Sequence, residues 1–273
     1  MKTLRALAAL LLGLWFVSGL LLFVFQRRFI FASPGPTVAP VAPGARRLDL
    51  ATGAGWSVTA LHWPAPRGHR TVVHFHGNGE QLAWQREMAE AWRAAGYGVV
   101  AMEYPGYGVM ADVAPSEGAL LRAAETLLQH LETSPETPSE RLILQGFSLG
   151  TGVAIEMARR GHGGALVLLA PYTSMREMAA QRMPLWPTGL MLLDRFESAS
   201  RAPGVRQPVL LLHGAEDTLI LPEMSERLAR RFRRAERAVI DGAGHNDLFA
   251  RGTPEIVARL ARFAPPVIDA AAR

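Results

Sequence analysis

The most specific signal in this chain is LILQGFSLG, residues 142–150. It opens with an apolar, strand-like run, passes through the pattern G-x-S-x-G and leads into a helix-compatible stretch at residues 151–160. A strand, a sharp turn and a helix are the context in which the serine of this pattern, here Ser148, becomes an exposed nucleophile. Gly146 and Gly150 suit that turn, because it strains the backbone at the serine and brings helix and strand too close for bulky side chains. Ser148 is therefore the candidate nucleophile.

Similar apolar segments recur along the chain and alternate with helical ones. Strands are predicted at residues 48–50, 57–62, 71–76, 99–102, 142–145, 166–169, 209–213 and 238–240. Helices are predicted at residues 82–95, 116–132, 151–160, 222–233 and 254–263, with Gly96 closing the first and Ser116 capping the second. After a leading antiparallel pair, this alternation predicts an α/β fold with a mostly parallel sheet and helices on both faces. Ligands of such sheets bind at the carboxyl ends of the strands.

Composition limits the class of protein and its chemistry. The chain has 273 residues, 49% of them hydrophobic, which suits one α/β domain with an added apolar segment. It has no cysteine, so disulfides, zinc–thiolate sites and cysteine nucleophiles are excluded. The net charge of +5 comes with no nucleic-acid-binding motif, and we expect no nucleic-acid partner.

The N-terminal segment differs in character from the rest. Residues 6–25 carry no charge and are long enough to cross about 30 Å of hydrocarbon as a helix. A cleaved signal peptide is the alternative, but it needs a shorter apolar core and a small-residue cleavage site, whereas Arg27 and Arg28 follow here. We therefore predict an uncleaved single-pass membrane anchor. Positive charges flank both of its ends, so its orientation stays open.

These observations divide the chain into four parts. We predict a membrane anchor at residues 1–28, a Pro-rich linker at 29–45, an α/β domain at 46–266 and a C-terminal tail at 267–273. Within the domain, residues 171–204 interrupt the alternation of strands and helices and are rich in Met and Leu. We expect this segment to form a small cap over the site.

Two further residues complete a candidate catalytic set with Ser148. A serine hydroxyl needs a base, normally His, which a buried carboxylate holds in one tautomer. Asp217 and His245 follow Ser148 in the order serine, acid, histidine, each just past a predicted strand. Glu216 and Asp241 are rival acids, and Asp217 could instead cap the following helix. We expect Ser148, Asp217 and His245 to meet at the carboxyl ends of the strands as one active site.

An oxyanion hole needs backbone N–H groups aimed at the developing negative charge. One is expected from Leu149, directly after the nucleophile. The second is expected from Asn78 in the glycine-rich stretch HGNG, with Gly79 as the rival donor. His74 and His76 form an H-x-H pair, but no third ligand lies nearby, so we predict neither a metal site nor a cofactor.

Three residues are candidate substrate contacts. Gly79 allows the backbone to approach a substrate, Tyr107 lies in the tight loop EYPGYG, and Trp186 belongs to the apolar cap. Tyr107 could equally pack in the interior, and the cap side chains could be plain core. An apolar cap would form an acyl pocket, so the expected partner is a small-molecule or lipid-like acyl substrate.

Six motifs, taken in order, resemble those of the α/β-hydrolase superfamily, especially its small members with an N-terminal membrane segment. They are HGNG at 76–79, EYPGYG at 103–108, GFSLG at 146–150, APYTS at 170–174, HGAED at 213–217 and GHND at 244–247. The resemblance covers roughly residues 45–265, and it includes the apolar segment followed by QRRFIF. It implies an eight-stranded, mostly parallel sheet with an antiparallel second strand. It also implies Ser148 as nucleophile, Asp217 as acid and His245 as base.

Activity in that subgroup is hydrolysis of carboxylic esters or thioesters, including lipids and fatty-acylated proteins. We therefore expect a membrane-anchored serine hydrolase that works through an acyl-enzyme. A serine peptidase and a non-catalytic scaffold are alternatives on the same fold. The sequence leaves the natural substrate and the oligomeric state open.

Overall fold

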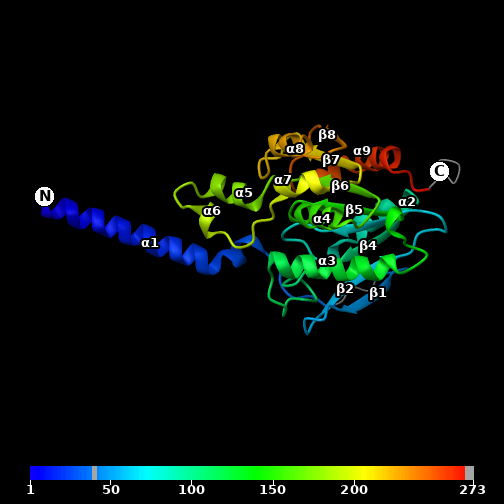
Figure 1. The fold of residues 1–273 in the computed structure, drawn as a ribbon, viewed down its shortest axis with the longest axis horizontal. Helices are drawn as coiled ribbons and strands as arrows, with labels where there is room; N and C mark the ends of the chain where they lie inside the picture. Colours follow the sequence, from blue (N-terminus) through cyan, green and yellow to red (C-terminus); the bar gives the residue numbers. More distant parts are fainter. Residues whose placement is uncertain (39–41, 268–273) are drawn as a thin grey trace.

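The centre of the molecule is one mixed β-sheet (Figure 1). The computed structural model describes residues 1–38 and 42–267, and within them eight strands pair in the order β1-β2-β4-β3-β5-β6-β7-β8. The strands are β1 (Arg46–Ala51), β2 (Ser57–Trp63), β3 (Thr71–Phe75), β4 (Gly98–Met102), β5 (Leu142–Phe147), β6 (Ala165–Leu169), β7 (Val209–Gly214) and β8 (Ala235–Ile240). β2 runs antiparallel to β1 and β4, and the other neighbouring pairs are parallel. The predicted sheet is therefore confirmed, including its antiparallel second strand.

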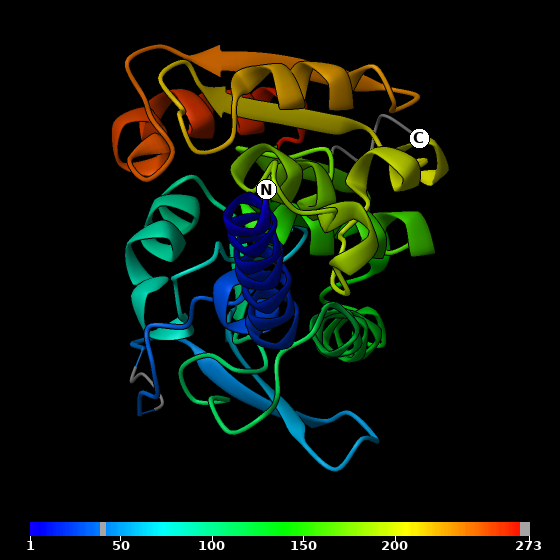
Figure 2. The same cartoon turned by 90° about the vertical axis from the view of Figure 1, so that its left-hand side faces the viewer.

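Helices cover both faces of the sheet (Figure 2). One face carries α3 (Glu117–Glu132), α4 (Leu149–Arg160) and α8 (Pro222–Ala229), and the other carries α2 (Arg86–Ala94) and α9 (Leu248–Phe263). Short 3-10 turns lie at η1 (Leu82–Trp84), η2 (Ser139–Arg141) and η3 (Ala202–Gly204). Parallel strands need such crossover helices, which bury both faces of the sheet. The predicted α/β class is confirmed.

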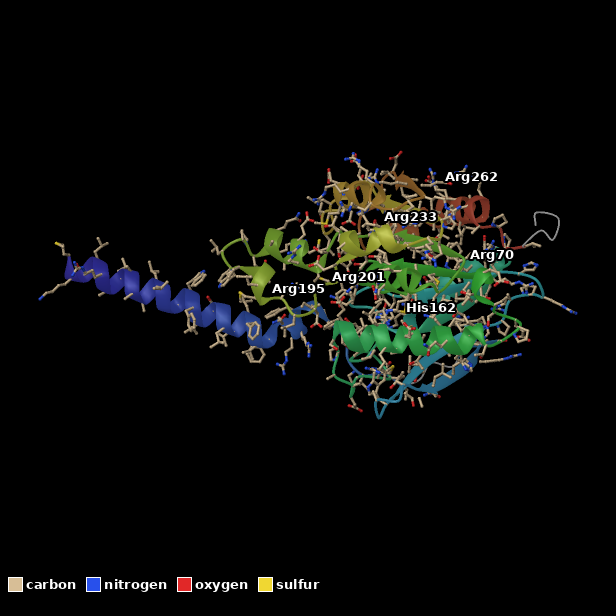
Figure 3. All side chains as sticks on the ribbon, viewed as in Figure 1. Arg70, His162, Arg195, Arg201, Arg233 and Arg262 are labelled. Atoms are coloured by element: carbon tan, nitrogen blue, oxygen red, sulfur yellow. The ribbon has the colours of Figure 1, made fainter. Side chains whose placement is uncertain are left out.

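The N-terminal helix α1 (Lys2–Ile30) projects from the domain (Figure 3). It is long and apolar enough to cross a membrane, and most of its large apolar side chains are exposed. Figure 3 shows mainly carbon along this helix, whereas nitrogen and oxygen atoms crowd over the domain. The helix continues to Ile30, two residues beyond the predicted anchor, and its last turns are buried against the domain at Gln26 and Ile30.

The predicted cap forms short helices beside α1. They are α5 (Met175–Arg182), α6 (Thr188–Met191) and α7 (Ser198–Arg201). In Figure 1, α5 and α6 stand out from the sheet on the side from which α1 projects. The described part of the predicted linker lies along the domain, where Pro36 pairs with Gly108 in an isolated bridge. Residues 39–41 of that linker and residues 268–273 of the predicted tail lie outside the described residues.

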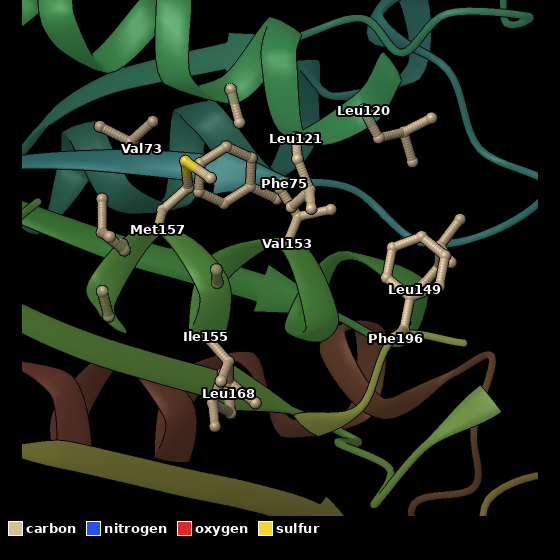
Figure 4. Close-up of a cluster of buried hydrophobic side chains, with 14 of the residues drawn as sticks. Val73, Phe75, Leu120, Leu121, Leu149, Val153, Ile155, Met157, Leu168 and Phe196 are labelled. Atoms are coloured by element: carbon tan, nitrogen blue, oxygen red, sulfur yellow. The ribbon is translucent and has the colours of Figure 1, made fainter. Parts of the chain in front are cut away.

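The core under α4 explains why this helix is so firmly placed. Figure 4 shows Val153 and Met157 of α4 close to Phe75 of β3, with Leu168 of β6 further along the same cluster. All four side chains are fully buried, as are nearly all residues of α4 itself. Burying side chains of this size stabilises a fold by about 1.5–3 kcal/mol each. α4 therefore holds its N-terminal residue, and Ser148 before it, in a fixed position.

Three predicted helices have different limits in the structure. The helix predicted at 82–95 is a 3-10 turn followed by α2, with Gly96 at φ +91° just beyond its end. α8 stops at Ala229 rather than residue 233, because the arginines that follow would repel one another on a helix and Phe232 turns into the core. α9 begins at Leu248 and runs through Pro254, because buried Leu248 extends its apolar face beyond the proline.

The contact of α4 with β3 leaves no room for a side chain at Gly150. A Cβ atom there would lie 2.0 Å from the carbonyl oxygen of Phe75. We expect Gly150→Ala to prevent accumulation of folded protein, because both partners of the clash are backbone. Gly118→Ala makes the same change in α3, where the nearest heavy atom is 4.0 Å away, and should stabilise the fold by about 0.5–1 kcal/mol. Thermal unfolding in detergent checks both, and a folded Gly150→Ala protein with wild-type stability would contradict the argument.

Candidate active site

Ser148 lies at the sharp turn between β5 and α4. Its φ of +49° and ψ of −117° are unusual for a residue with a side chain. Its backbone N–H donates to the carbonyl of Leu169 at 2.9 Å, which anchors the turn to β6. The turn also requires glycine at position 146, because a Cβ atom on Gly146 would lie 2.5 Å from the carbonyl oxygen of Gly150. Strain of this kind costs about 1–3 kcal/mol and is typical of functional positions.

The structure brings the three predicted catalytic side chains together. Oγ of Ser148 lies 2.9 Å from Nε2 of His245, and Nδ1 of His245 lies 2.7 Å from Oδ2 of Asp217. The three residues follow β5, β8 and β7, so each comes from the carboxyl end of a parallel strand. All three are buried. This geometry lets a proton move from the hydroxyl to the imidazole while the carboxylate holds the ring.

Asp217 is held as an ionised acceptor. Besides His245, it accepts hydrogen bonds from the backbone N–H groups of Leu219 at 2.9 Å and Ile220 at 2.8 Å. Burial raises the pKa of this carboxyl, but the hydrogen bonds from His213, His245 and Ile220 outweigh that effect and hold it well below its ordinary value. The carboxylate therefore stays charged across the neutral range.

The rival acids have other surroundings. Glu216 and Asp241 are exposed, whereas the carboxylate that contacts the imidazole of His245 belongs to Asp217.

A further residue of the site, His213, was not among the residues predicted from the sequence. Its Nε2 lies 3.1 Å from Oδ2 of Asp217 and 2.8 Å from the carbonyl oxygen of Ile220. The sequence feature that could have indicated this role is a polar residue near the end of the buried strand β7, four positions before Asp217.

The two predicted oxyanion donors lie on the loops after β5 and β3. Leu149 is the first residue of α4, where backbone N–H groups have no acceptor within the helix. The side chain of Asn78 fastens its loop to the chain leaving α1. Its Nδ2 donates to the carbonyl of Ile30 at 2.8 Å, and its Oδ1 accepts from the backbone N–H of Ala32 at 2.9 Å. The rival donor Gly79 has a left-handed φ of +78°.

The two other predicted substrate contacts, Tyr107 and Trp186, lie in different parts of the structure. Tyr107 is fully buried, and its hydroxyl donates to Oδ1 of Asn78 at 2.6 Å. Burial and nearby Glu103 raise the pKa of Tyr107 well above its ordinary value, so the phenol stays protonated. The structure thus gives Tyr107 a packing role beneath the loop. Trp186 lies on the surface of the cap and lines an apolar pocket.

The H-x-H pair is engaged with other partners. Nδ1 of His74 lies 3.0 Å from Oε1 of Gln145, and burial lowers the pKa of His74 to about 3. Nε2 of His76 lies 3.2 Å from the buried carboxylate of Glu103. Within the described residues, no group of three or more His, Cys, Asp or Glu side chains is arranged to hold a metal ion.

The apolar pocket has a volume of about 230 Å³. Its lining residues come from the cap, which includes Met175, from α1, and from two loops that contribute Asn78 and Leu219. These three follow β3, β6 and β7, and β5 with Ser148 lies between β3 and β6 in the sheet. The pocket therefore lies at the same edge of the sheet as the catalytic side chains, although Ser148, Asp217 and His245 are not among its lining residues.

Comparison with known proteins identifies relatives in sequence. A family model described as serine aminopeptidase, S33, matches residues 66–196. An uncharacterised protein of Mycobacterium tuberculosis is 31% identical over 255 residues, which cover 90% of this chain and 90% of the relative. The α/β-hydrolase domain-containing protein 17C of Xenopus tropicalis is 32% identical over 237 residues, covering 76% and 73%.

Solved structures share the fold. An esterase of Pyrococcus furiosus superposes with a TM-score of 0.69 at 18% identity, covering 85% of this chain and 97% of the esterase. A second esterase, from Thermogutta terrifontis, gives a TM-score of 0.64 at 14% identity, covering 84% and 98%. The family itself is shown by the Xenopus tropicalis relative, which is 32% identical over more than two thirds of both chains, and the chain belongs to the α/β-hydrolase family.

The environment of Asp217 predicts how stability depends on pH. Its folded pKa lies below its ordinary value, so its carboxylate stabilises the fold at neutral pH and this contribution is lost as pH falls. We expect thermal stability in detergent to fall less steeply in Asp217→Asn than in wild type as the pH is lowered from about 5 to about 2, because the loss begins near the unfolded pKa and continues toward the lower folded one. Asp241→Asn removes an exposed acid and should retain the wild-type slope. Equal slopes in all three proteins would contradict this account of Asp217.

Proposed function

We propose that this protein is a membrane-anchored serine hydrolase that cleaves carboxylic ester or thioester bonds of acyl or lipid-like substrates. The observation that carries the proposal is the relay of hydrogen bonds from Ser148 through His245 to Asp217, at 2.9 and 2.7 Å. In the α/β-hydrolase family this order and geometry suit acyl transfer to water through a covalent intermediate.

In the proposed mechanism, Oγ of Ser148 attacks the carbonyl carbon while its proton passes to Nε2 of His245. Asp217 stabilises the imidazolium that forms. The backbone N–H groups of Leu149 and Asn78 hold the oxyanion. The tetrahedral intermediate collapses, His245 gives its proton to the departing alcohol or thiol, and an acyl-enzyme remains. Water, deprotonated by the same imidazole, then releases the carboxylic acid and restores Ser148.

The pocket favours an acyl substrate over a peptide with a free amino terminus. Its lining is mostly aliphatic, aromatic and Met side chains, and Arg182 is the charged residue among the described residues that line it. A protonated amine would meet this guanidinium and no carboxylate there. An aminopeptidase, the class that the matching family model describes, needs an acceptor for that amine. The pocket chemistry therefore supports ester or thioester cleavage, with peptidase activity as the second candidate.

Membrane anchoring is supported by the character of α1. Its apolar side chains are exposed along most of its length, which is unfavourable in water and favourable in lipid. A cleaved signal peptide fits poorly with this helix, because it continues without a break past Arg27 and Arg28 and is bonded to the domain at its end.

We expect the full chain to remain in the membrane fraction after alkaline washing, with its N-terminus intact. The physical reason is that the exposed apolar surface of a helix of this length is held by the bilayer rather than by charge. Immunoblotting with tags at each end checks this result. A tag at the N-terminus that separates from the domain, or a domain released by the wash, would establish a cleaved or peripheral protein.

Ser148→Ala is expected to abolish both labelling by a fluorophosphonate probe and turnover, by at least about a thousandfold, because no other group takes the nucleophile's role. Ser200→Ala is the matched control, since this serine is an exposed cap residue away from His245. Both variants are compared with wild type in detergent by gel fluorescence.

Turnover of matched substrate panels separates the candidate activities. Acyl esters and thioesters should be cleaved, whereas aminoacyl anilides should not. Preferential cleavage of the anilides would replace the esterase proposal by the peptidase one. Folded wild type that neither reacts with the probe nor turns over any panel would favour a scaffold.

A further inference from the structure

The membrane helix is fastened to the cap far along its length. Nε1 of Trp15 donates to the carbonyl of Leu185 at 2.8 Å, and Nε1 of Trp186 donates to the carbonyl of Trp15 at 3.4 Å. One turn further on, Gly19 gives the indole of Trp186 room, since a Cβ atom there would lie 3.0 Å from its ring. The cap therefore contacts α1 as far back as Trp15, within the apolar segment, and not only at the last turns of the helix.

A second set of contacts holds the last turns of α1. Oε1 of Gln26 accepts from the backbone N–H of Leu193 at 2.8 Å, and its Nε2 donates to the carbonyl of Met191 at 3.2 Å. Nε of Arg27 donates to the buried carboxylate of Asp194 at 2.8 Å. These polar bonds fix both the depth and the rotation of the helix relative to the cap, so one face of α1 always points toward α5 and α6.

That face is part of the apolar pocket. Five residues of α1 line it, and they are Leu22, Phe23, Gln26, Phe29 and Ile30. Met178 and Met183 lie among the lining residues from the cap, and Asn78 and Leu219 come from the loops after β3 and β7. Ser148 and His245 do not line the pocket themselves, but Leu219 donates its backbone N–H to Asp217, so the pocket lies next to the catalytic set.

The outer part of the cap extends the apolar surface of α1. Leu185, Leu190 and Leu193 are 70%, 84% and 58% exposed, and they belong to the segment that is bonded to α1. Leucines exposed in this way, next to a helix that suits a bilayer, are stable where hydrocarbon covers them. These leucines and the exposed apolar side chains of α1 therefore form one apolar surface beside the pocket.

We propose that α1 is one wall of the acyl-binding site, and that the acyl chain of the substrate enters this site from the bilayer. This proposal rests on the proposed function, since it places the chain of the acyl group that Ser148 would receive. An acyl chain that passes from lipid to a pocket between α1 and the cap remains in an apolar environment throughout. Its transfer does not expose the methylene groups of the chain to water, which would be unfavourable. The membrane helix is then a specificity element as well as an anchor.

Two neighbouring leucines of α1 provide a matched test. Leu22 lines the pocket, whereas Leu21 is 52% exposed and does not. Leu22→Trp should narrow the pocket and lower kcat/KM for a palmitoyl thioester at least tenfold relative to a butyryl thioester, mainly through KM. Leu21→Trp should leave this ratio as in wild type. Both variants are measured as full chains in lipid nanodiscs.

A second measurement does not depend on turnover. A photoreactive palmitate probe added to Ser148→Ala in nanodiscs should crosslink to α1 and α5, and Leu22→Trp in the same background should reduce this crosslinking. A palmitoyl-to-butyryl ratio unchanged by Leu22→Trp, an equal loss for both thioesters, or crosslinks to both leucine variants alike would overturn the role of α1. Failure of the proposed function is distinguishable, because wild type would then neither bind the fluorophosphonate probe nor cleave either thioester.

Discussion

The strained backbone at Ser148 is the constraint on which the rest of the site depends. A residue with a side chain keeps a φ of +49° only where the surrounding structure holds its backbone in place. At Ser148, β5 and α4 hold the backbone on either side, and β6 binds its N–H through the carbonyl of Leu169. Gly146 and Gly150 are required because backbone approaches backbone at both positions. The turn raises the serine hydroxyl above the sheet, toward the loops after β7 and β8. Two hydrogen bonds depend on this turn, one between Ser148 and His245, which are 97 positions apart, and one between His245 and Asp217, which are 28 apart.

The attachment of α1 gives its polar residues a second purpose. A flank of Gln and Arg after an apolar segment is usual at a membrane boundary. Here Gln26 and Arg27 also bind the cap, through the backbone of Leu193 and the carboxylate of Asp194. Arg28 differs from them, because its guanidinium lies 5.6 Å from the ring centroid of Phe25 and remains exposed. Arg27 therefore holds α1 to the domain, whereas its neighbour Arg28 lies exposed on the helix surface.

Much of the fold could be predicted because its signals are local. Apolar runs marked the strands, and Ser116 and Gly96 marked helix ends where a hydroxyl cap and a left-handed turn are observed. The limits of α8 and α9 could not be predicted, since they depend on where Phe232 and Leu248 find buried space. The role of His213 could not be predicted for a related reason, because its contact with Asp217 depends on how the loop after β7 folds back toward the strand. The fit of α1 to the cap is likewise non-local, because Trp15 and Leu185 are 170 positions apart.

Asn78 connects the two parts of the molecule that the sequence suggested were separate. Its amide holds the carbonyl of Ile30 and the N–H of Ala32, and its oxygen also receives the hydroxyl of Tyr107. The same residue belongs to the loop whose backbone is proposed to hold the oxyanion. Moving α1 away from the domain would break two of these hydrogen bonds and free the loop to shift. Donors of an oxyanion hole act through fixed positions, and a small displacement weakens them. The position of α1 and the geometry of the loop proposed to hold the oxyanion are therefore set by the same side chain.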